Sequence, residues 1–144
     1  TLSNLKIDSL VLSYSDAECK LNKDFKYADE LDFIVTHDKR LNFTKNLVST
    51  IKGNTLILFQ FVEKHGVPLF NLIFSSPSKS KIRVLQSIGR GLRLGDNKTQ
   101  CKLYDIADDL TYKSKPNFTL RHFIERINIY NEEEFDYQIH RIKL

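Results

Sequence analysis

Residues 55–62, Thr-Leu-Ile-Leu-Phe-Gln-Phe-Val, decide the fold class because they form the clearest strand in the sequence. Their apolar residues lack the alternation of a half-exposed strand, and such a continuous run is typical of a strand buried on both faces of a parallel sheet. Gly53 and Asn54 interrupt the chain just before the run. We therefore expect an α/β fold with a mostly parallel sheet flanked by helices.

Other strands and helices are expected on both sides of this run. Apolar spacing predicts strands at residues 7–14 and 102–106, with a loop or short turn over residues 15–26. Helical spacing predicts two helices between residues 25 and 50 that meet near His37 and Asp38, and further helices at 63–73, at 79–94 and, one or two of them, at 119–143. About four strands make a thin sheet, so the α/β lobe is expected to be incomplete.

Residues 68–77 contain a suspicious junction. An apparent helix runs into an apparent strand there with no glycine, polar loop or cap between them. One interpretation is that a segment is missing between Ile73 and Phe74. The other is a helix that continues to Ser75 and stops before Pro77.

Composition narrows the class of protein. The 144 residues, 41% of them hydrophobic, suffice for one core, and the formal net charge of +4 permits a nucleic-acid partner without requiring one. No apolar run approaches the roughly 20 residues that a membrane crossing needs, so we expect no membrane partner and a location in the cytoplasm. Cys19 and Cys101 are isolated from each other and from any metal-binding motif, so no metal site is expected.

The segment with the clearest chemistry is Gln86-Ser-Ile-Gly-Arg-Gly-Leu-Arg93. At 100° per residue its polar side chains share one stripe of the predicted helix with those just upstream: Lys79, Arg83, Gln86, Arg90 and Arg93. Gly89 and Gly91 each disfavour a helix interior by about 1 kcal/mol, which indicates close approach of another surface or a local break. Arginine favours multidentate recognition of phosphate. A solvated basic face fits the periodicity equally well.

These eight residues match QxxGRxxR, and in this the chain resembles the superfamily-two helicases, whose sixth motif has that pattern. Residues 58–66 are similar to the fourth-motif region, while residues 78–85 and 103–109 are similar to the phage recombination and repair DNA helicases of the UvsW type. The resemblance implies that residues 1–144 form a second, C-terminal RecA-like (P-loop NTPase-type) lobe, with residues 1–53 leading into it.

The resemblance also implies roles for individual residues. Arg93 would be the arginine finger, with Arg90 beside it at the γ-phosphate, and Gln86 and Gly89 would complete the ATP-binding segment. Three upstream cations would contact nucleic-acid phosphates: Lys79, Lys81 and Arg83. Asp105, Asp108 and Asp109 fit turn and cap positions better than a magnesium site.

The sequence departs from the family in two ways. It contains no GxxxxGK[ST] phosphate loop and no Walker B acidic pair, so the chain alone is expected not to hydrolyse ATP. ATP and Mg²⁺ would be held mainly by a first RecA-like lobe, which thus becomes an expected partner. The fifth motif is also missing, and its place coincides with the junction between Ile73 and Phe74.

Two functions follow from these expectations. The first is the C-terminal lobe of an ATP-dependent DNA helicase or branch-remodelling translocase acting on single-stranded or branched DNA, in the host cytoplasm if a phage encodes it. The alternative is a non-catalytic nucleic-acid-binding or interaction module derived from a helicase lobe.

Overall fold

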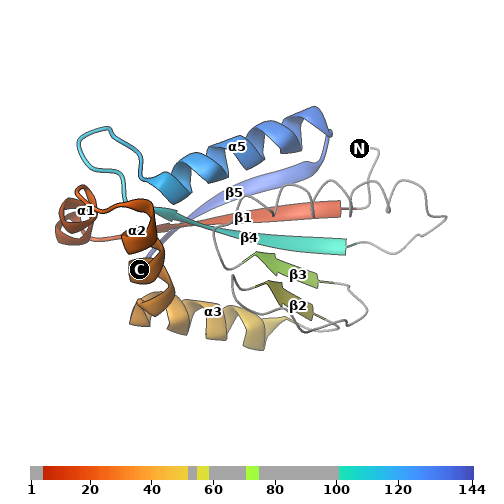
Figure 1. Ribbon diagram of the computed structural model, residues 1–144. Coiled ribbons are helices and arrows are strands. Elements are labelled where there is room, and N and C mark those ends of the chain that lie inside the picture. Colours follow the sequence, from red (N-terminus) through yellow and green to blue (C-terminus); the bar gives the residue numbers. More distant parts are fainter. Residues whose placement is uncertain (1–4, 52–54, 59–70, 75–100) are drawn as a thin grey trace.

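The computed structural model describes residues 5–51, 55–58, 71–74 and 101–144 (Figure 1). In chain order the elements are β1 (Leu5–Ser13), α1 (Asp16–Asn22), α2 (Tyr27–Thr36), α3 (Asp38–Thr50), β2 (Thr55–Leu58), β3 (Asn71–Phe74), β4 (Cys101–Asp109), α5 (Phe118–Glu132) and β5 (Asp136–Lys143). The strands at residues 7–14 and 102–106 and the two helices meeting at His37 are confirmed.

The strands form one sheet in the order β2-β3-β4-β1-β5, and every neighbouring pair is parallel. This confirms the predicted α/β class with its parallel sheet. Because Ser13 is the register partner of both Asp109 and Lys143, the carboxyl ends of β1, β4 and β5 meet at one edge. We call this the carboxyl edge. β1 lies between β4 and β5, so residues 5–13 are part of the sheet of the lobe.

Helices cover both faces of the sheet (Figure 1). Alternate residues of β1 point to opposite faces. On one face the strands pack against α5 through a cluster of buried residues: Leu5, Ile7, Leu103, Tyr130 and Phe135. On the other face they pack against α1 and α2 through a second cluster: Leu12, Tyr14, Cys19, Ile34, Ile106 and Leu110. α3 adds the partly buried Phe43 and Leu47 to this second cluster.

The prediction of a loop or short turn over residues 15–26 was wrong for α1. Ser15 caps this helix: its hydroxyl accepts from the Glu18 backbone N–H at 3.2 Å, and the Glu18 carboxylate accepts from the Ser15 N–H at 3.2 Å. This reciprocal capping box satisfies two backbone donors, which allows a short polar helix to form.

The prediction of a helix over residues 63–73, and its variant reaching Ser75, was wrong for residues 71–74. These residues form β3, which pairs with β2 on one side and β4 on the other. A short apolar run fits a helix or a buried strand equally well by its spacing, and pairing on both sides decides for the strand. Ile73 and Phe74, at the suspected junction, are consecutive residues of β3.

The terminal segment, predicted as one or two helices over residues 119–143, is only partly helical. α5 ends near Glu133, and Glu134 has a left-handed backbone (φ 56°) that ends the helix. β5 follows and pairs with β1. The helical spacing that linked Phe135 to Ile139 is therefore coincidental, since Phe135 is buried while Ile139 is 49% exposed.

No helix in the described part of the chain has the length and apolar content needed to cross a membrane. The predicted helix over residues 79–94 lies outside the described residues, as do residues 59–62 of the first strand.

Leu103→Ala should lower the free energy of unfolding by about 2–5 kcal/mol, because Leu103 is fully buried between the sheet and α5. The half-exposed Ile139 of β5 offers a control, since Ile139→Ala removes a side chain of equal size and should have a much smaller effect. Urea denaturation of both variants measures the difference. Equal destabilisation by the two substitutions would show that the Ile139 side chain is buried, which would contradict its exposed position on β5.

Candidate functional site at the carboxyl edge

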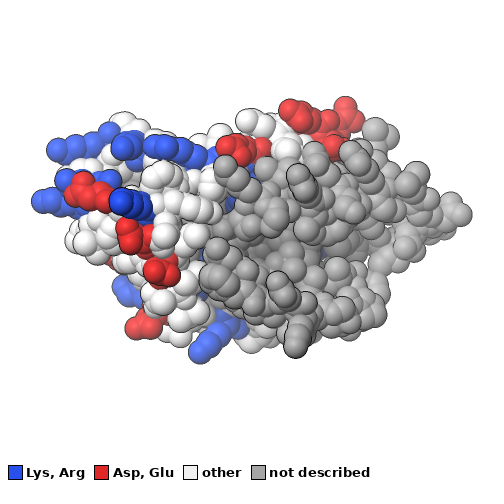
Figure 2. All heavy atoms as spheres, in the orientation of Figure 1, with Lys and Arg blue, Asp and Glu red and all other residues white. Residues whose placement is uncertain are grey.

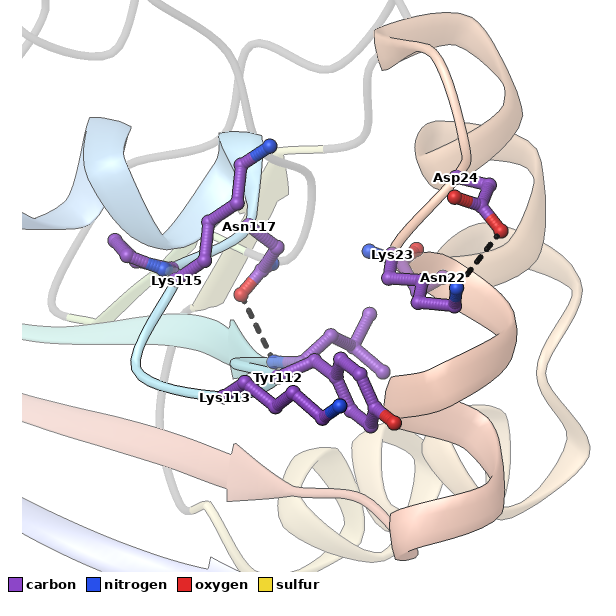
Figure 3. Close-up of a pocket in the computed structure, with 9 residues that line it drawn as sticks. Asn22, Lys23, Asp24, Tyr112, Lys113, Lys115 and Asn117 are labelled. Carbon is purple, nitrogen blue, oxygen red and sulfur yellow. Dashed lines mark hydrogen bonds and ion pairs between the residues drawn. The ribbon is translucent and has the colours of Figure 1, made fainter.

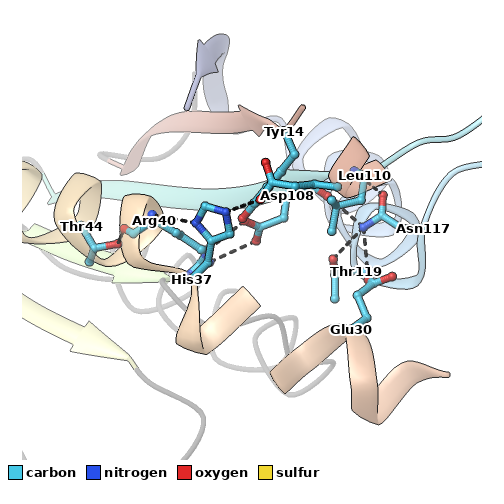
Figure 4. Close-up of polar contacts among 10 residues, drawn as sticks. Tyr14, Glu30, His37, Arg40, Thr44, Asp108, Leu110, Asn117 and Thr119 are labelled. Carbon is cyan, nitrogen blue, oxygen red and sulfur yellow. Dashed lines mark hydrogen bonds and ion pairs between the residues drawn. The ribbon is translucent and has the colours of Figure 1, made fainter. Parts of the chain in front are cut away.

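A buried ion pair stands at the centre of the carboxyl edge (Figure 4). The guanidinium of Arg40, from α3, donates Nε–H to Asp108 Oδ1 at 2.8 Å and Nη2–H to Asp108 Oδ2 at 3.1 Å. The Tyr14 hydroxyl donates to Oδ1 of the same carboxylate at 2.6 Å. Arg40 is 3% exposed and Asp108 is 1% exposed. This cluster joins the end of β1, the end of β4 and α3.

The surroundings raise the pKa of both groups that donate to Asp108, Arg40 and Tyr14. Burial alone would lower the pKa of the Arg40 guanidinium, but Asp108 outweighs this effect and the net pKa is raised. Burial, followed by the charge of Asp108, raises the pKa of the Tyr14 hydroxyl far above its ordinary value. Arg40 therefore stays charged and Tyr14 remains a donor, so both groups hold the Asp108 carboxylate in a structural clamp.

A second buried carboxylate, Glu30 of α2, organises the segment after β4 (Figure 4). It accepts from the backbone N–H of Thr119 at 2.7 Å and of Phe118 at 3.2 Å, at the start of α5. It also accepts from the side-chain amides of Asn22 at 2.9 Å and Asn117 at 3.1 Å. A carboxylate at a helix N-terminus is favoured by the helix dipole, and Glu30 thereby connects α1, α2 and α5.

Asn117 closes the loop that leaves β4. Its side-chain Oδ1 accepts from the Leu110 N–H at 2.9 Å, and its Nδ2 donates to the Asp108 carbonyl at 3.0 Å. Inside this loop Tyr112 and Lys115 exchange two backbone hydrogen bonds of 3.0–3.1 Å. Both residues between them, Lys113 and Ser114, have left-handed backbones (φ 46° and 65°), as a tight type I′ turn requires.

This turn forms one wall of a pocket of about 340 Å³, shown in Figure 3. The segment 112–117 lies on one side and Asn22, Lys23 and Asp24 lie on the other. Three of the lining residues, Lys23, Lys113 and Lys115, are exposed lysines. Lys23 forms one exposed ion pair, with Asp24 at 3.4 Å. The pocket is therefore rimmed by cations.

Figure 2 shows Lys and Arg side chains at the end of the molecule formed by α1 and the segment preceding α5, with Asp and Glu side chains among them. Positive charge concentrated on one surface attracts polyanions and accelerates their association. The carboxyl edge therefore combines a rigid buried clamp with an exposed cationic rim.

His37 reinforces the joint between α2 and α3. Its Nδ1 accepts from the Arg40 backbone N–H at 3.3 Å and so caps α3, which leaves the proton on Nε2. Nε2 donates to the Glu18 carboxylate of α1. Burial would raise the pKa of Glu18, but hydrogen bonds from His37 and Ser15 more than offset it, and the net pKa lies below its ordinary value of 4.5.

The three aspartates of β4 each pair with a different arginine. Asp108 pairs with Arg40, Asp109 with the exposed Arg141 at 3.0 Å, and Asp105 with Arg126 at 2.9 and 3.0 Å. Arg126 comes from α5, on the opposite face of the sheet, and the Tyr130 hydroxyl also donates to Asp105. Their carboxylates are engaged in ion pairs, and within the described residues no group of three or more His, Cys, Asp or Glu side chains could hold a metal ion.

The residues that the sequence assigned to ATP and nucleic acid lie outside the described part of the chain. This holds for Gln86, Gly89, Arg90 and Arg93 and for Lys79, Lys81 and Arg83. Conversely, sequence reasoning overlooked Lys23, Lys113 and Lys115. For Lys113 and Lys115 the available signal was the run Tyr112-Lys-Ser-Lys-Pro116 shortly after a strand, where loops of parallel sheets commonly bind ligands.

Comparison with known proteins finds one relative in both sequence and structure. The chain is 33% identical over 116 residues to the ATP-dependent DNA helicase UvsW of Enterobacteria phage T4, and the match covers 72% of this chain and 23% of the helicase. The crystal structure of T4 UvsW matches with a TM-score of 0.72 at 21% identity, over 97% of this chain and 42% of that chain. No family model matches. The chain thus spans about a quarter of the helicase's length, and the resemblance to a UvsW-like helicase lobe is confirmed.

Asp108→Asn should lower the free energy of unfolding by about 3–5 kcal/mol, because it leaves the buried Arg40 guanidinium without a counter-charge. Asp109→Asn is the matched control, since Asp109 pairs with an arginine that is 67% exposed and should contribute at most about 1 kcal/mol. Thermal and urea unfolding give both values. A loss at Asp108 no larger than at Asp109 would refute the clamp.

The Glu18 interactions should stabilise the fold only above acidic pH. The folded-state pKa of Glu18 is lowered, so the stabilisation is fully present above its unfolded value and is lost as pH falls through the folded value. The difference in unfolding free energy between wild type and Glu18→Gln should therefore shrink from about pH 6 to about pH 2. Urea titrations across this range test it, and a difference that grows on acidification would contradict the assignment.

Proposed function

We propose that this chain, a UvsW-like helicase lobe, serves as the second RecA-like lobe of an ATP-dependent DNA helicase or branch-remodelling translocase. The observation that carries the proposal is the agreement of two independent comparisons on one helicase: 33% sequence identity over 72% of the chain, and the same fold over 97% of it. A sheet whose strands are all parallel, with helices on both faces, is the architecture such a lobe needs.

Within this proposal the arginines of Gln86-Ser-Ile-Gly-Arg-Gly-Leu-Arg93 act on ATP. In the sequence the segment falls between β3 and β4, two adjacent parallel strands, and connections between such strands commonly carry ligand-binding residues in α/β folds. Arg93 is the proposed arginine finger, which stabilises charge on the γ-phosphoryl group in transfer. Arg90 contacts the same phosphate, and Gln86 and Gly89 complete the segment.

A first lobe is the proposed partner and holds most of the ATP and its Mg²⁺, because this sequence has no phosphate loop or Walker B pair. The chain alone would then be inactive. Lys79, Lys81 and Arg83 are the proposed contacts to phosphates of single-stranded or branched DNA. The cytoplasm, of the host if a phage encodes the protein, is where such an enzyme would work.

The segment expected between Ile73 and Phe74 stays a prediction. Both residues pair with β4, opposite Tyr104 and Asp105. If the fifth motif is absent from the natural chain, coupling between ATP and strand movement would be impaired.

The alternative function is a non-catalytic nucleic-acid-binding module. The cationic rim of Lys23, Lys113 and Lys115 favours it, because this surface needs neither ATP nor a first lobe to attract a polyanion. Such a module would bind nucleic acid in a salt-sensitive manner that ignores ATP.

Arg93→Ala, introduced into the two-lobe enzyme, should reduce ATP hydrolysis by about a thousandfold or more, because the transition-state charge loses its arginine. Steady-state phosphate release measures the rate. Arg141→Ala is the matched control: it removes an arginine that is 67% exposed on β5, and hydrolysis should continue at the wild-type rate.

Normal hydrolysis by a folded Arg93→Ala enzyme would refute the finger assignment. A wild-type enzyme that binds DNA in a salt-sensitive manner but shows no ATP hydrolysis would favour the module instead.

A further inference from the structure

Two exposed aromatic rings come close in the sequence to residues that line the cationic pocket, Asp24 and Asn117. Tyr27, at the start of α2, and Phe118, at the start of α5, meet edge to face with centroids 6.0 Å apart, and each is 37% exposed. The guanidinium of Arg121 lies over the Phe118 ring, 5.6 Å from its centroid. We call these three residues, with Lys23, Lys113 and Lys115, the carboxyl-edge surface.

The buried network holds the two parts of this surface together. Asn117, which lines the pocket, immediately precedes Phe118, and Glu30 binds both the Asn117 amide and the Phe118 N–H. Tyr27 precedes Glu30 by three residues on α2 and so lies on the same side of that helix. Glu30 is fully buried and its carboxylate accepts hydrogen bonds from the segments on both sides. The backbone segments that carry the rings and the lysines therefore have a defined relative position before any ligand arrives.

Exposed aromatic rings beside cations suit one class of ligand. Single-stranded nucleic acid offers phosphates to the lysines and unstacked bases to the rings, whereas a duplex keeps its base faces hidden. The alternative interpretation of the rings as ordinary core is excluded by their exposure, and a purely solvated charge cluster would not explain two adjacent exposed aromatics. The one acidic side chain of the pocket, Asp24, is 79% exposed in its ion pair with Lys23, so a phosphate can replace it.

We propose that the carboxyl-edge surface is a binding site for single-stranded nucleic acid, additional to the cations of residues 79–83. Lys23, Lys113 and Lys115 contact backbone phosphates around the pocket, and Tyr27 and Phe118 stack on bases. The site would give the lobe a further contact to a nucleic-acid strand. It rests on the proposed function only for its role within a helicase. Binding itself requires neither ATP nor Arg93.

The test measures binding of fluorescein-labelled oligo(dT), oligo(rU) and a blunt DNA duplex by anisotropy, without nucleotide, over a series of salt concentrations. Lys113→Gln combined with Lys115→Gln should weaken binding to a single strand about tenfold at low salt. It should also reduce the slope of log affinity against log salt by about 1.4, since each lost phosphate contact on a single strand removes about 0.7. Lys39→Gln combined with Lys45→Gln, an equal charge change at exposed positions of α3, should alter neither.

The rings are tested separately. Tyr27→Leu combined with Phe118→Leu keeps apolar bulk at both positions and should weaken single-strand binding about tenfold with little change in the salt slope. Loss on oligo(dT) alone identifies DNA, loss on oligo(rU) alone identifies RNA, and loss on both identifies a site that accepts either; each supports the proposal.

Unchanged single-strand affinity in folded lysine variants would overturn the proposal. An equal loss of affinity for the single strands and for the DNA duplex would also overturn it. These outcomes are distinct from failure of the helicase role. Wild-type hydrolysis by Arg93→Ala would remove the finger assignment and leave the surface intact, while normal strand binding by the lysine variants would remove the surface and leave the finger assignment intact.

Discussion

The pairing of Asp108 with Arg40 is the interaction on which the carboxyl edge depends. Its two hydrogen bonds of 2.8 and 3.1 Å, with the bond from Tyr14, tie the ends of β1 and β4 to α3 in a site closed to water. Removal of one partner would leave a buried charge uncompensated, which is far more destabilising than loss of an exposed pair. The backbone that surrounds this pair is therefore held in one arrangement, and the loop after β4 starts from a rigid point.

β4 carries a second buried ion pair on its other face. Asp105 and Asp108 are three residues apart, and an odd separation along a strand directs side chains to opposite faces of the sheet. Asp105 thus meets Arg126 of α5, while Asp108 meets Arg40 of α3. One strand is in this way joined to a helix layer on each side by a buried, bidentate ion pair. Asp105, Asp108 and Glu30 are engaged inside the fold, whereas the lysines around the pocket are exposed and can meet a ligand.

Much of the fold could be predicted from the sequence, and the failures share a cause. β1, β4, α5 and the joint of α2 and α3 at His37 follow from apolar spacing, because each buries a regular pattern against a neighbour. Residues 71–73 of β3 were predicted as the end of a helix, and β5 was not predicted. Residues 71–74 are too few to distinguish a helix from a strand, and β5 shares its apparent helical spacing with α5 until the left-handed Glu134 separates them. α1 was missed for another reason, since a capping box and not an apolar pattern defines it.

The sequence by itself determined the α/β class, the family resemblance and the motif of Gln86 to Arg93, since these depend on local pattern and on residue identity. Only the tertiary structure decided which charges are buried and which are free. Arg40, Arg126, Lys113 and Lys115 are all basic residues, yet two are paired inside the fold and two face solvent. Their difference arises because partners up to 68 residues away along the chain supply the opposite charge, and such long-range contacts leave no local trace.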